Sequence, residues 1–131
     1  MINQHPDVFT FVGKIYDKAK LCGILRDNQV FAMPSITETF GLVYLEALSQ
    51  NLPVLYTKGQ GIDGLFDDTV GVGVNPMSVQ EIKDALRVLL LENEKFSKLV
   101  KELSGAKPAW ISIPKTILYE FARDLHIIKR K

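Results

Sequence analysis

Two glutamates, Glu38 and Glu46, are the acidic residues of this 131-residue chain whose spacing first suggests a site. If every residue between them were helical, they would be separated by a rise of about 12 Å. The two carboxylates of a glycoside hydrolase lie only about 5 to 9.5 Å apart. The spacing therefore fits a hydrolytic pair poorly and suits contacts at opposite ends of an extended ligand. On spacing alone, two surface glutamates are the simpler interpretation.

The residues around the glutamates predict a strand, a loop, a helix and a second strand. Residues 30–33 are an apolar run, which is typical of a parallel strand covered on both faces. Residues 53–56 predict the next strand. Between the strands, five residues recur at the spacing of one buried helical face, namely Phe40, Val43, Tyr44, Ala47 and Leu48.

A helix that begins near Thr39 would present an anion site at its N-terminus. The backbone N–H groups of a first turn have no acceptor within the helix, and the helix dipole adds positive charge there, so phosphate is a typical ligand. These first-turn groups belong to Phe40, Gly41, Leu42 and Val43. Gly41 also leaves room for a diphosphate close to the backbone. A plainer interpretation stays open, in which Ser35 and Glu38 form a capping box and Glu38 only caps the helix.

The rest of the chain alternates predicted strands and helices. Further strands are predicted at residues 9–13 and 70–74, and helices at residues 14–28, 79–90, 94–103 and beyond Trp110. A capping box of Ser78 and Glu81 opens the helix at 79–90, and the glycines in 70–74 indicate close backbone packing. This order predicts an α/β domain with a Rossmann-like, mostly parallel sheet flanked by helices and a helical C-terminal end. Because ligands bind beyond the carboxyl ends of such strands, the loops at 34–41 and 57–64 are the expected site.

The string at residues 34–47, P-S-I-T-E-T-F-G-L-V-Y-L-E-A, resembles the donor-binding signature of the family 4 (group 1) retaining glycosyltransferases, which have the GT-B fold. The shared pattern is P-S-x-x-E-x-F-G-x-x-x-x-E-A, followed by P-V. Flanking segments also match: F-V-G before a helix, V-N-P after the glycine-rich loop, and a tryptophan before the final helix. The resemblance covers roughly residues 9–121 and implies part of the C-terminal, donor-binding domain.

The resemblance implies a role for each residue of the signature. Glu38 would contact the hydroxyls of the transferred sugar and is the expected catalytic residue, Thr39 would contact the phosphate or the sugar, and Glu46 would bind the ribose hydroxyls. The backbone N–H groups offered to the diphosphate would be those of Phe40, Gly41 and Leu42. The implied reaction transfers a glycosyl group from a nucleotide-diphosphate sugar to an acceptor hydroxyl with retention, in polysaccharide or glycoconjugate biosynthesis. No metal or other cofactor is expected, since the helix dipole and basic side chains stabilise the leaving diphosphate.

The sequence departs from the family pattern at several positions. Asn51 stands where a glycine usually precedes P-V, and asparagine also tolerates the left-handed conformation of a helix cap. The glycine-rich loop reads G-Q-G-I-D-G where many members have G-G-x-x-E, so Asp63 either replaces the acid or only shapes the loop. Lys14 and Lys58 match none of the basic residues with which the family grips the diphosphate, and both are predicted to be surface lysines.

The resemblance also predicts an incomplete enzyme. Residues 1–131 would form one partial nucleotide-sugar-binding domain, with a core at about 9–92 and C-terminal helices at about 93–128, and without the acceptor-binding N-terminal domain. The isolated chain is therefore expected to be inactive. Residues 9–13 and 30–33 would be the third and fourth strands of the domain, and the strands that normally separate them have no counterpart. An exposed sheet edge of this kind predicts self-association or low stability.

Composition sets further bounds. A net charge of +1 leaves no basic excess for nucleic acid, and no apolar run approaches the roughly 20 residues of a membrane span. One cysteine and no visible signal peptide predict a cytoplasmic protein, or one peripheral to the inner membrane face as part of a full enzyme. A metal site is not expected, because His5 and His126 lie at opposite ends of the chain. The expected partners are the nucleotide-sugar donor and, in the full enzyme, a glycan or lipid-linked acceptor.

Two other functions stay open at this point. The chain could be a non-catalytic module that binds a nucleotide-sugar or a partner transferase. A nucleotide-sugar epimerase on a similar fold is the weaker alternative.

Overall fold

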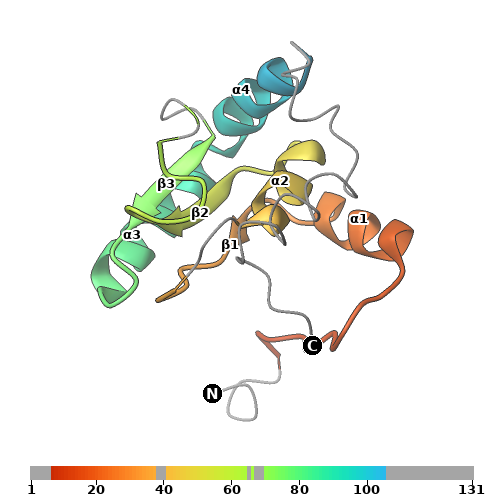
Figure 1. The fold of residues 1–131 in the computed structure, drawn as a ribbon, viewed down its shortest axis with the longest axis horizontal. Helices are drawn as coiled ribbons and strands as arrows, with labels where there is room; N and C mark the ends of the chain where they lie inside the picture. The colour runs from red at the N-terminus through yellow and green to blue at the C-terminus, as the bar shows by residue number, and fades with distance from the viewer. Residues whose placement is uncertain (1–6, 38–40, 65, 67–69, 106–131) are drawn as a thin grey trace, which may run out of the picture.

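The computed structural model describes residues 7–37, 41–64, 66 and 70–105 of the chain. Within them, three parallel strands form one sheet in the order β1-β2-β3, and helices flank it (Figure 1). The strands are β1 (Phe31–Ala32), β2 (Val54–Thr57) and β3 (Gly71–Val74). The predicted α/β architecture, a Rossmann-like fragment with a parallel sheet, is confirmed.

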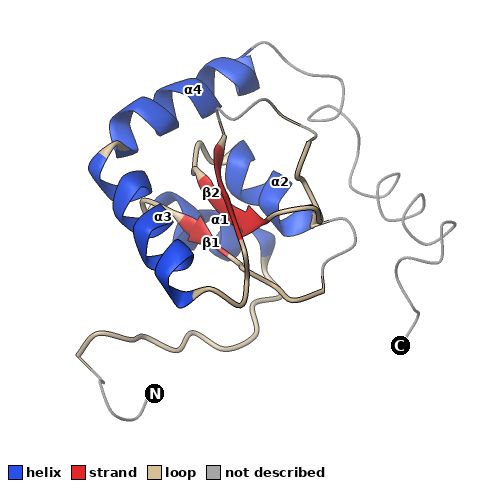
Figure 2. Ribbon diagram, turned by 90° about the vertical axis from the view of Figure 1, so that its left-hand side faces the viewer, coloured by secondary structure: helices blue, strands red, loops and turns tan. Residues whose placement is uncertain are grey.

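Four helices accompany the sheet. They are α1 (Lys18–Arg26), α2 (Leu42–Ser49), α3 (Val79–Leu91) and α4 (Asn93–Gly105). α2 and α3 lie on opposite sides of the strands (Figure 2). The order strand, helix, strand, strand, helix fits the short connections of a parallel α/β sheet. Among the described residues, no helix is long and apolar enough to cross a membrane.

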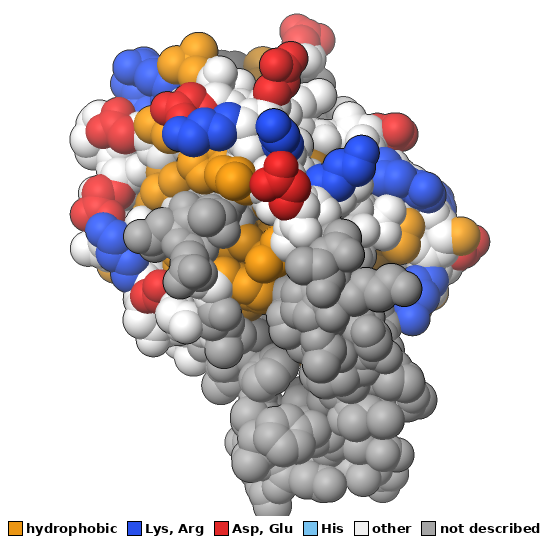
Figure 3. All heavy atoms as spheres, turned by 90° about the horizontal axis from the view of Figure 1, so that it is seen from above, with side chains coloured by type: hydrophobic (Ala, Val, Ile, Leu, Met, Phe, Trp, Pro, Cys, Tyr) orange, Lys and Arg blue, Asp and Glu red, His pale blue; other side chains and the backbone are white. Residues whose placement is uncertain are grey.

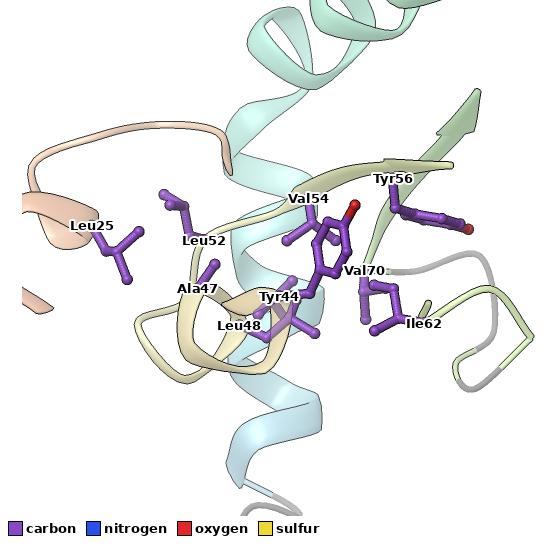
Figure 4. Close-up of a cluster of buried hydrophobic side chains, with 10 residues drawn as sticks. Leu25, Tyr44, Ala47, Leu48, Leu52, Val54, Tyr56, Ile62 and Val70 are labelled. Atoms are coloured by element: carbon purple, nitrogen blue, oxygen red, sulfur yellow. The ribbon is translucent and has the colours of Figure 1, made fainter. Parts of the chain in front are cut away.

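The central strand β2 is buried on both faces and divides the core into two clusters. Val54 and Tyr56 point to the side of α2, whereas Leu55 points to the side of α3. This alternation follows from the two-residue repeat of a strand. Figure 4 shows Tyr44 and Leu48 of α2 reaching into the first cluster beside Val54. A strand covered on both faces explains the unbroken apolar run that the sequence shows there.

The end of α2 confirms the expectation for Asn51. Its φ is 61°, which makes it the one non-glycine residue with positive φ in the part of the chain that the structure describes. The Asn51 N–H donates to the carbonyl of Leu48 at 2.9 Å, and the Leu52 N–H donates to that of Ala47 at 3.1 Å. This pair of bonds is the Schellman arrangement, and it turns the chain directly into β2.

The close backbone packing predicted for residues 70–74 is confirmed at Gly71. A Cβ atom placed on Gly71 would lie 1.7 Å from the carbonyl oxygen of Val54, the residue opposite it in β2. No side chain fits at that separation. Glycine is therefore required at this position for the two strands to pair.

The strand predicted at residues 9–13 is absent from the structure. These residues form an exposed loop outside the layers of the fold (Figure 2), and the Phe11 side chain is 80% exposed. The physical reason is that a strand needs a neighbour for its backbone groups, and no described strand pairs with this segment. The helix predicted from Lys14 begins at Lys18, because the Asp17 carboxylate accepts the Ala19 N–H and caps it there.

Other predictions fall beyond the described part of the chain. The last helix, predicted after Trp110, lies wholly outside the described residues. The sheet does leave β1 as an edge, since β2 is its only described neighbour. Self-association through the incomplete sheet stays a prediction, and sedimentation of a stable monomer would contradict it.

Candidate functional site

The two loops that the sequence selected lie against each other at the carboxyl end of the sheet. The Thr57 hydroxyl, at the end of β2, donates to the carbonyl of Ser35 at 2.7 Å. The Gln60 amide, in the loop that follows, donates to the carbonyl of Ile36 at 2.9 Å. These bonds join residues 22 and 24 positions apart in the chain. The loop after β1 is thus held by side chains from the end of β2 and from the loop that follows it.

A third side chain fixes the start of the same loop from the other direction. The Tyr44 hydroxyl on α2 donates to the carbonyl of Met33, the residue after β1. Its ring packs edge-on against Phe31, with 5.7 Å between ring centroids and an angle of 87° between the planes. Tyr44 is 1% exposed, so this contact is part of the core. The aromatic pair therefore couples α2 to the exit of β1.

The helix predicted near Thr39 begins later in the structure, at Leu42. Its N-cap is Gly41, with φ 64° and ψ 45°, a left-handed conformation that favours glycine. No side chain caps this helix. The capping-box alternative needs a helix that begins directly after Ser35, but residues 36 and 37 are not helical. Glu38, the other half of that box, lies outside the described residues.

The start of α2 has the properties of an anion site. Leu42 and Val43 are its first two residues, so their N–H groups have no acceptor in a preceding helical turn. The positive end of the dipole of this eight-residue helix lies at the same place. Two of the residues expected to serve the diphosphate, Gly41 and Leu42, therefore lie at the N-terminus of α2.

Glu46 lies in the second turn of α2 and is half-buried. Because Gly41 is left-handed and α2 begins at Leu42, the segment from Glu38 to Glu46 is not helical throughout. The four helical steps from Leu42 to Glu46 give a rise of about 6 Å. The separation of about 12 Å that an all-helical segment would give does not apply. Glu38, Thr39 and Phe40 lie outside the described residues, so their predicted roles stay predictions.

The loop after β2 settles what Asp63 does in the structure. Its carboxylate accepts the N–H of Gly59 at 2.5 Å and closes a turn within the loop. Both Gly59 and Gly61 have positive φ, which this turn requires. Asp63 therefore shapes the loop. It also borders a shallow cavity of about 350 Å³ along β3, and none of the donor residues that the structure describes, Gly41, Leu42 and Glu46, lines that cavity.

Glu81 connects a third loop, which follows β3 and includes Asn75, to Lys58 in the loop after β2. The Glu81 carboxylate accepts the Asn75 N–H at 2.9 Å and pairs with the Lys58 ammonium at 3.3 Å. These two groups hold the pKa of Glu81 below its ordinary value. The Ser78 hydroxyl accepts the Glu81 N–H as predicted. The reciprocal half of the capping box is wrong, because the carboxylate binds Asn75 and Lys58 instead.

Charge and metal chemistry add little beyond these contacts. Lys58 and Lys14 are exposed, as predicted, and Lys58 is engaged by Glu81. On the face in Figure 3, basic and acidic side chains alternate around an apolar area and do not form a patch of one sign. Within residues 7–37, 41–64, 66 and 70–105, no group of three histidine, cysteine or acidic residues is placed to hold a metal ion.

Comparison with known proteins identifies the family. The family described as "Glycosyl transferases group 1" matches residues 4–104, which include every described helix apart from the last residue of α4. The chain belongs to this family. The family match and the parallel sheet agree with the resemblance found in the sequence, and glycosyl transfer is the general chemistry of the group.

Individual members of known function are similar to this chain over only part of their own length. Sulfoquinovosyl transferase SQD2 of Arabidopsis thaliana is 41% identical over 71 residues, 51% of this chain and 14% of the relative. D-inositol 3-phosphate glycosyltransferase of Arthrobacter sp. (strain FB24) is 32% identical over 90 residues, 68% of this chain and 20% of the relative. Sucrose synthase of Acidithiobacillus caldus is 30% identical over 107 residues, 78% of this chain and 14% of the relative. The chain thus spans a small part of each, and no solved structure matches it.

Proposed function

We propose that this chain binds the nucleotide diphosphate of a sugar donor at the N-terminus of α2, as the donor side of a retaining glycosyltransferase. The observation that carries the proposal is the start of α2. A left-handed Gly41 opens the helix directly beyond the carboxyl end of the parallel sheet, with the N–H groups of Leu42 and Val43 at its positive end. Membership of the group 1 family supports a sugar donor as the owner of that diphosphate.

The proposed chemistry assigns roles to the residues of the signature. The bond between the anomeric carbon and the diphosphate oxygen breaks, and negative charge develops on the diphosphate. The start of α2 stabilises that charge without a metal, because its dipole and N–H groups are already oriented. Glu38 contacts the sugar hydroxyls, Thr39 the phosphate or sugar, and Glu46 the ribose. Phe40 contributes a backbone N–H with Gly41 and Leu42.

Transfer to an acceptor is proposed for a protein that also carries an acceptor-binding domain. The chain covers 14% and 20% of two of the transferases it resembles, so a glycan or lipid-linked acceptor would bind elsewhere. A new bond between the anomeric carbon and the acceptor oxygen then replaces the broken one with retention. We place such an enzyme in the cytoplasm or at the inner face of the membrane.

Calorimetry with UDP, GDP and ADP tests the donor site directly. We expect one of the three to bind, and Glu46→Ala to remove the binding because the ribose hydroxyls lose their acceptor. Glu94→Ala is the matched control, since Glu94 is an exposed glutamate in the first turn of α4. Failure of all three diphosphates to bind, or equal loss in both variants, would contradict the proposal.

A second measurement separates sugar recognition from nucleotide binding. For the nucleotide that binds, its sugar conjugates should bind more tightly than the diphosphate alone, and Glu38→Ala should remove that difference without removing diphosphate binding. Product formation after addition of an acceptor-binding domain would then distinguish a transferase from a module that only binds. An unchanged preference for the conjugate in Glu38→Ala would contradict the role given to Glu38.

A further inference from the structure

We propose that Thr57 and Gln60 are positioning residues, which hold the exit of β1 in place against the start of α2 and so set the geometry of the diphosphate site. The inference rests on the function proposed above, but it concerns residues outside the signature string. Neither side chain belongs to α2. Both reach across from the end of β2 and the loop after it.

The burial of Thr57 is the first step of the argument. Its side chain is 2% exposed, and among the described residues it is the polar or charged member of the buried set. A buried hydroxyl costs free energy unless it is hydrogen-bonded, and valine would fill the same space in a strand without that cost. The hydroxyl does make a bond, to the carbonyl of Ser35 at 2.7 Å. The position therefore depends on that bond as well as on packing.

The second step concerns the backbone carbonyls after β1, which require hydrogen-bond donors. The last bond between β1 and its neighbour runs from the Met33 N–H to the carbonyl of Leu55, at 3.1 Å. Beyond it, the carbonyls of Ser35 and Ile36 receive side-chain donors from Thr57 and Gln60 in place of strand partners. Beyond the end of β1, side-chain donors thus replace the strand hydrogen bonds at Ser35 and Ile36.

The geometry of the loop is the third step. Only four residues, 37–40, separate Ile36 from Gly41. Ile36 is held by Gln60, and Gly41 is buried at the start of α2, whose Tyr44 hydroxyl binds the carbonyl of Met33. Both ends of this short connection are therefore fixed to the same framework. A site whose parts are fixed before binding loses less conformational entropy when the ligand arrives.

Two substitutions remove the donors while keeping the shape of the side chain. Thr57→Val removes the hydroxyl, and Gln60→Glu replaces the donor by a carboxylate that cannot donate when ionised. We expect each to weaken the binding of the nucleoside diphosphate by about threefold to tenfold, the scale of one hydrogen bond. Thr57→Ser, which retains the hydroxyl, should restore the affinity of the unaltered chain.

The control must separate positioning from a general loss of stability. Leu86→Ala truncates a half-buried side chain in the core cluster on the side of α3, away from the exit of β1. It should lower the unfolding temperature but leave the affinity unchanged when measured well below that temperature. Equal loss of affinity in Leu86→Ala and Thr57→Val would overturn the positioning role.

Amide hydrogen exchange without ligand keeps this inference distinct from the proposed function. Thr57→Val should speed exchange in the segment 33–44, and Leu86→Ala should not. If no diphosphate binds the unaltered chain while this exchange difference appears, the proposed function fails and the restraint on the loop stands. If binding occurs and Thr57→Val changes neither exchange nor affinity, the inference is overturned and the proposed function stands. Faster exchange with unchanged affinity would also overturn it.

Discussion

Two segments of similar composition, residues 9–13 and 30–33, have opposite fates in the structure. Both are short apolar runs that precede a helix along the chain, and both are predicted strands. In the second, the Phe31 N–H donates to the carbonyl of Pro53, just before β2, at 3.0 Å, and the Met33 N–H donates to that of Leu55 in β2 at 3.1 Å. Among the described strands the first has no such partner, and its Phe11 and Val12 side chains are 80% and 49% exposed.

The difference teaches that apolar composition is necessary for a strand but does not by itself produce one. The segment at 30–33 forms a strand because β2 lies beside it and because Tyr44 and Thr57 donate hydrogen bonds to the carbonyls of Met33 and Ser35. Backbone groups without such partners stay in water. The loop after β1 is therefore held in place by the neighbours of β1.

The largest effect is expected at Gly71. Gly71→Ala would place a Cβ atom 1.7 Å from the Val54 carbonyl oxygen, so β2 and β3 could not keep their register. We expect a loss of several kcal/mol, about 3 or more, and failure to fold, because a backbone contact cannot relax as a side chain does. Circular dichroism and chemical denaturation would measure it.

Gly13→Ala is the matched change in the unpaired segment. Gly13, unlike Gly71, has a positive φ of 74°, but no atom lies within 4 Å of the added Cβ. The exposed loop can readjust, so we expect unfolding free energy close to that of the unaltered chain. A large loss in Gly13→Ala would mean that the segment at 9–13 is fixed after all.

The next largest effect contrasts two apolar side chains. Leu48→Ala removes a side chain that is 1% exposed in the cluster between α2 and the sheet, and should cost about 2 to 5 kcal/mol. Phe11→Ala removes a larger side chain that is 80% exposed, and should change stability by about 0.5 kcal/mol or less. Urea denaturation of both variants tests the contrast, and comparable losses would contradict it.

A smaller effect is expected where α2 turns into β2. Asn51→Ala should cost about 1 kcal/mol, since alanine adopts the left-handed conformation at φ 61° less readily. Asn51→Gly should be neutral or slightly stabilising, because glycine adopts it without strain. The unfolding temperatures of Asn51→Gly and of the unaltered chain should both be higher than that of Asn51→Ala. Any other order would argue against the Schellman turn.

The smallest effect concerns Glu81, whose pKa is lowered by the Asn75 N–H and by Lys58. A lowered pKa in the folded state means that the carboxylate stabilises the fold above the pKa of the unfolded chain. That contribution is lost as the pH falls through the lower, folded pKa. Glu81→Gln should therefore unfold at a lower temperature than the unaltered chain at pH 7, and the difference should shrink in acid. A constant difference across that range would contradict the assignment.

Much of the fold could be predicted because its signals are local. The apolar run of β2, the glycines of β3 and the cap at Ser78 each act within a few residues, and each is confirmed. The left-handed Asn51 was predictable for the same reason. The helix periodicity predicts a start near Thr39. Because Gly41 is left-handed, α2 begins three residues later, at Leu42.

The sequence by itself determined the family, the parallel α/β class and the position of the signature between two strands, since these depend on residue types in a fixed order. The tertiary structure decided whether residues 9–13 pair, where the Glu81 carboxylate binds and which side chains hold the exit of β1. Each of these depends on a partner far along the chain, such as Thr57 for Ser35. Spacing in a sequence contains no information on such partners until the strands are placed side by side.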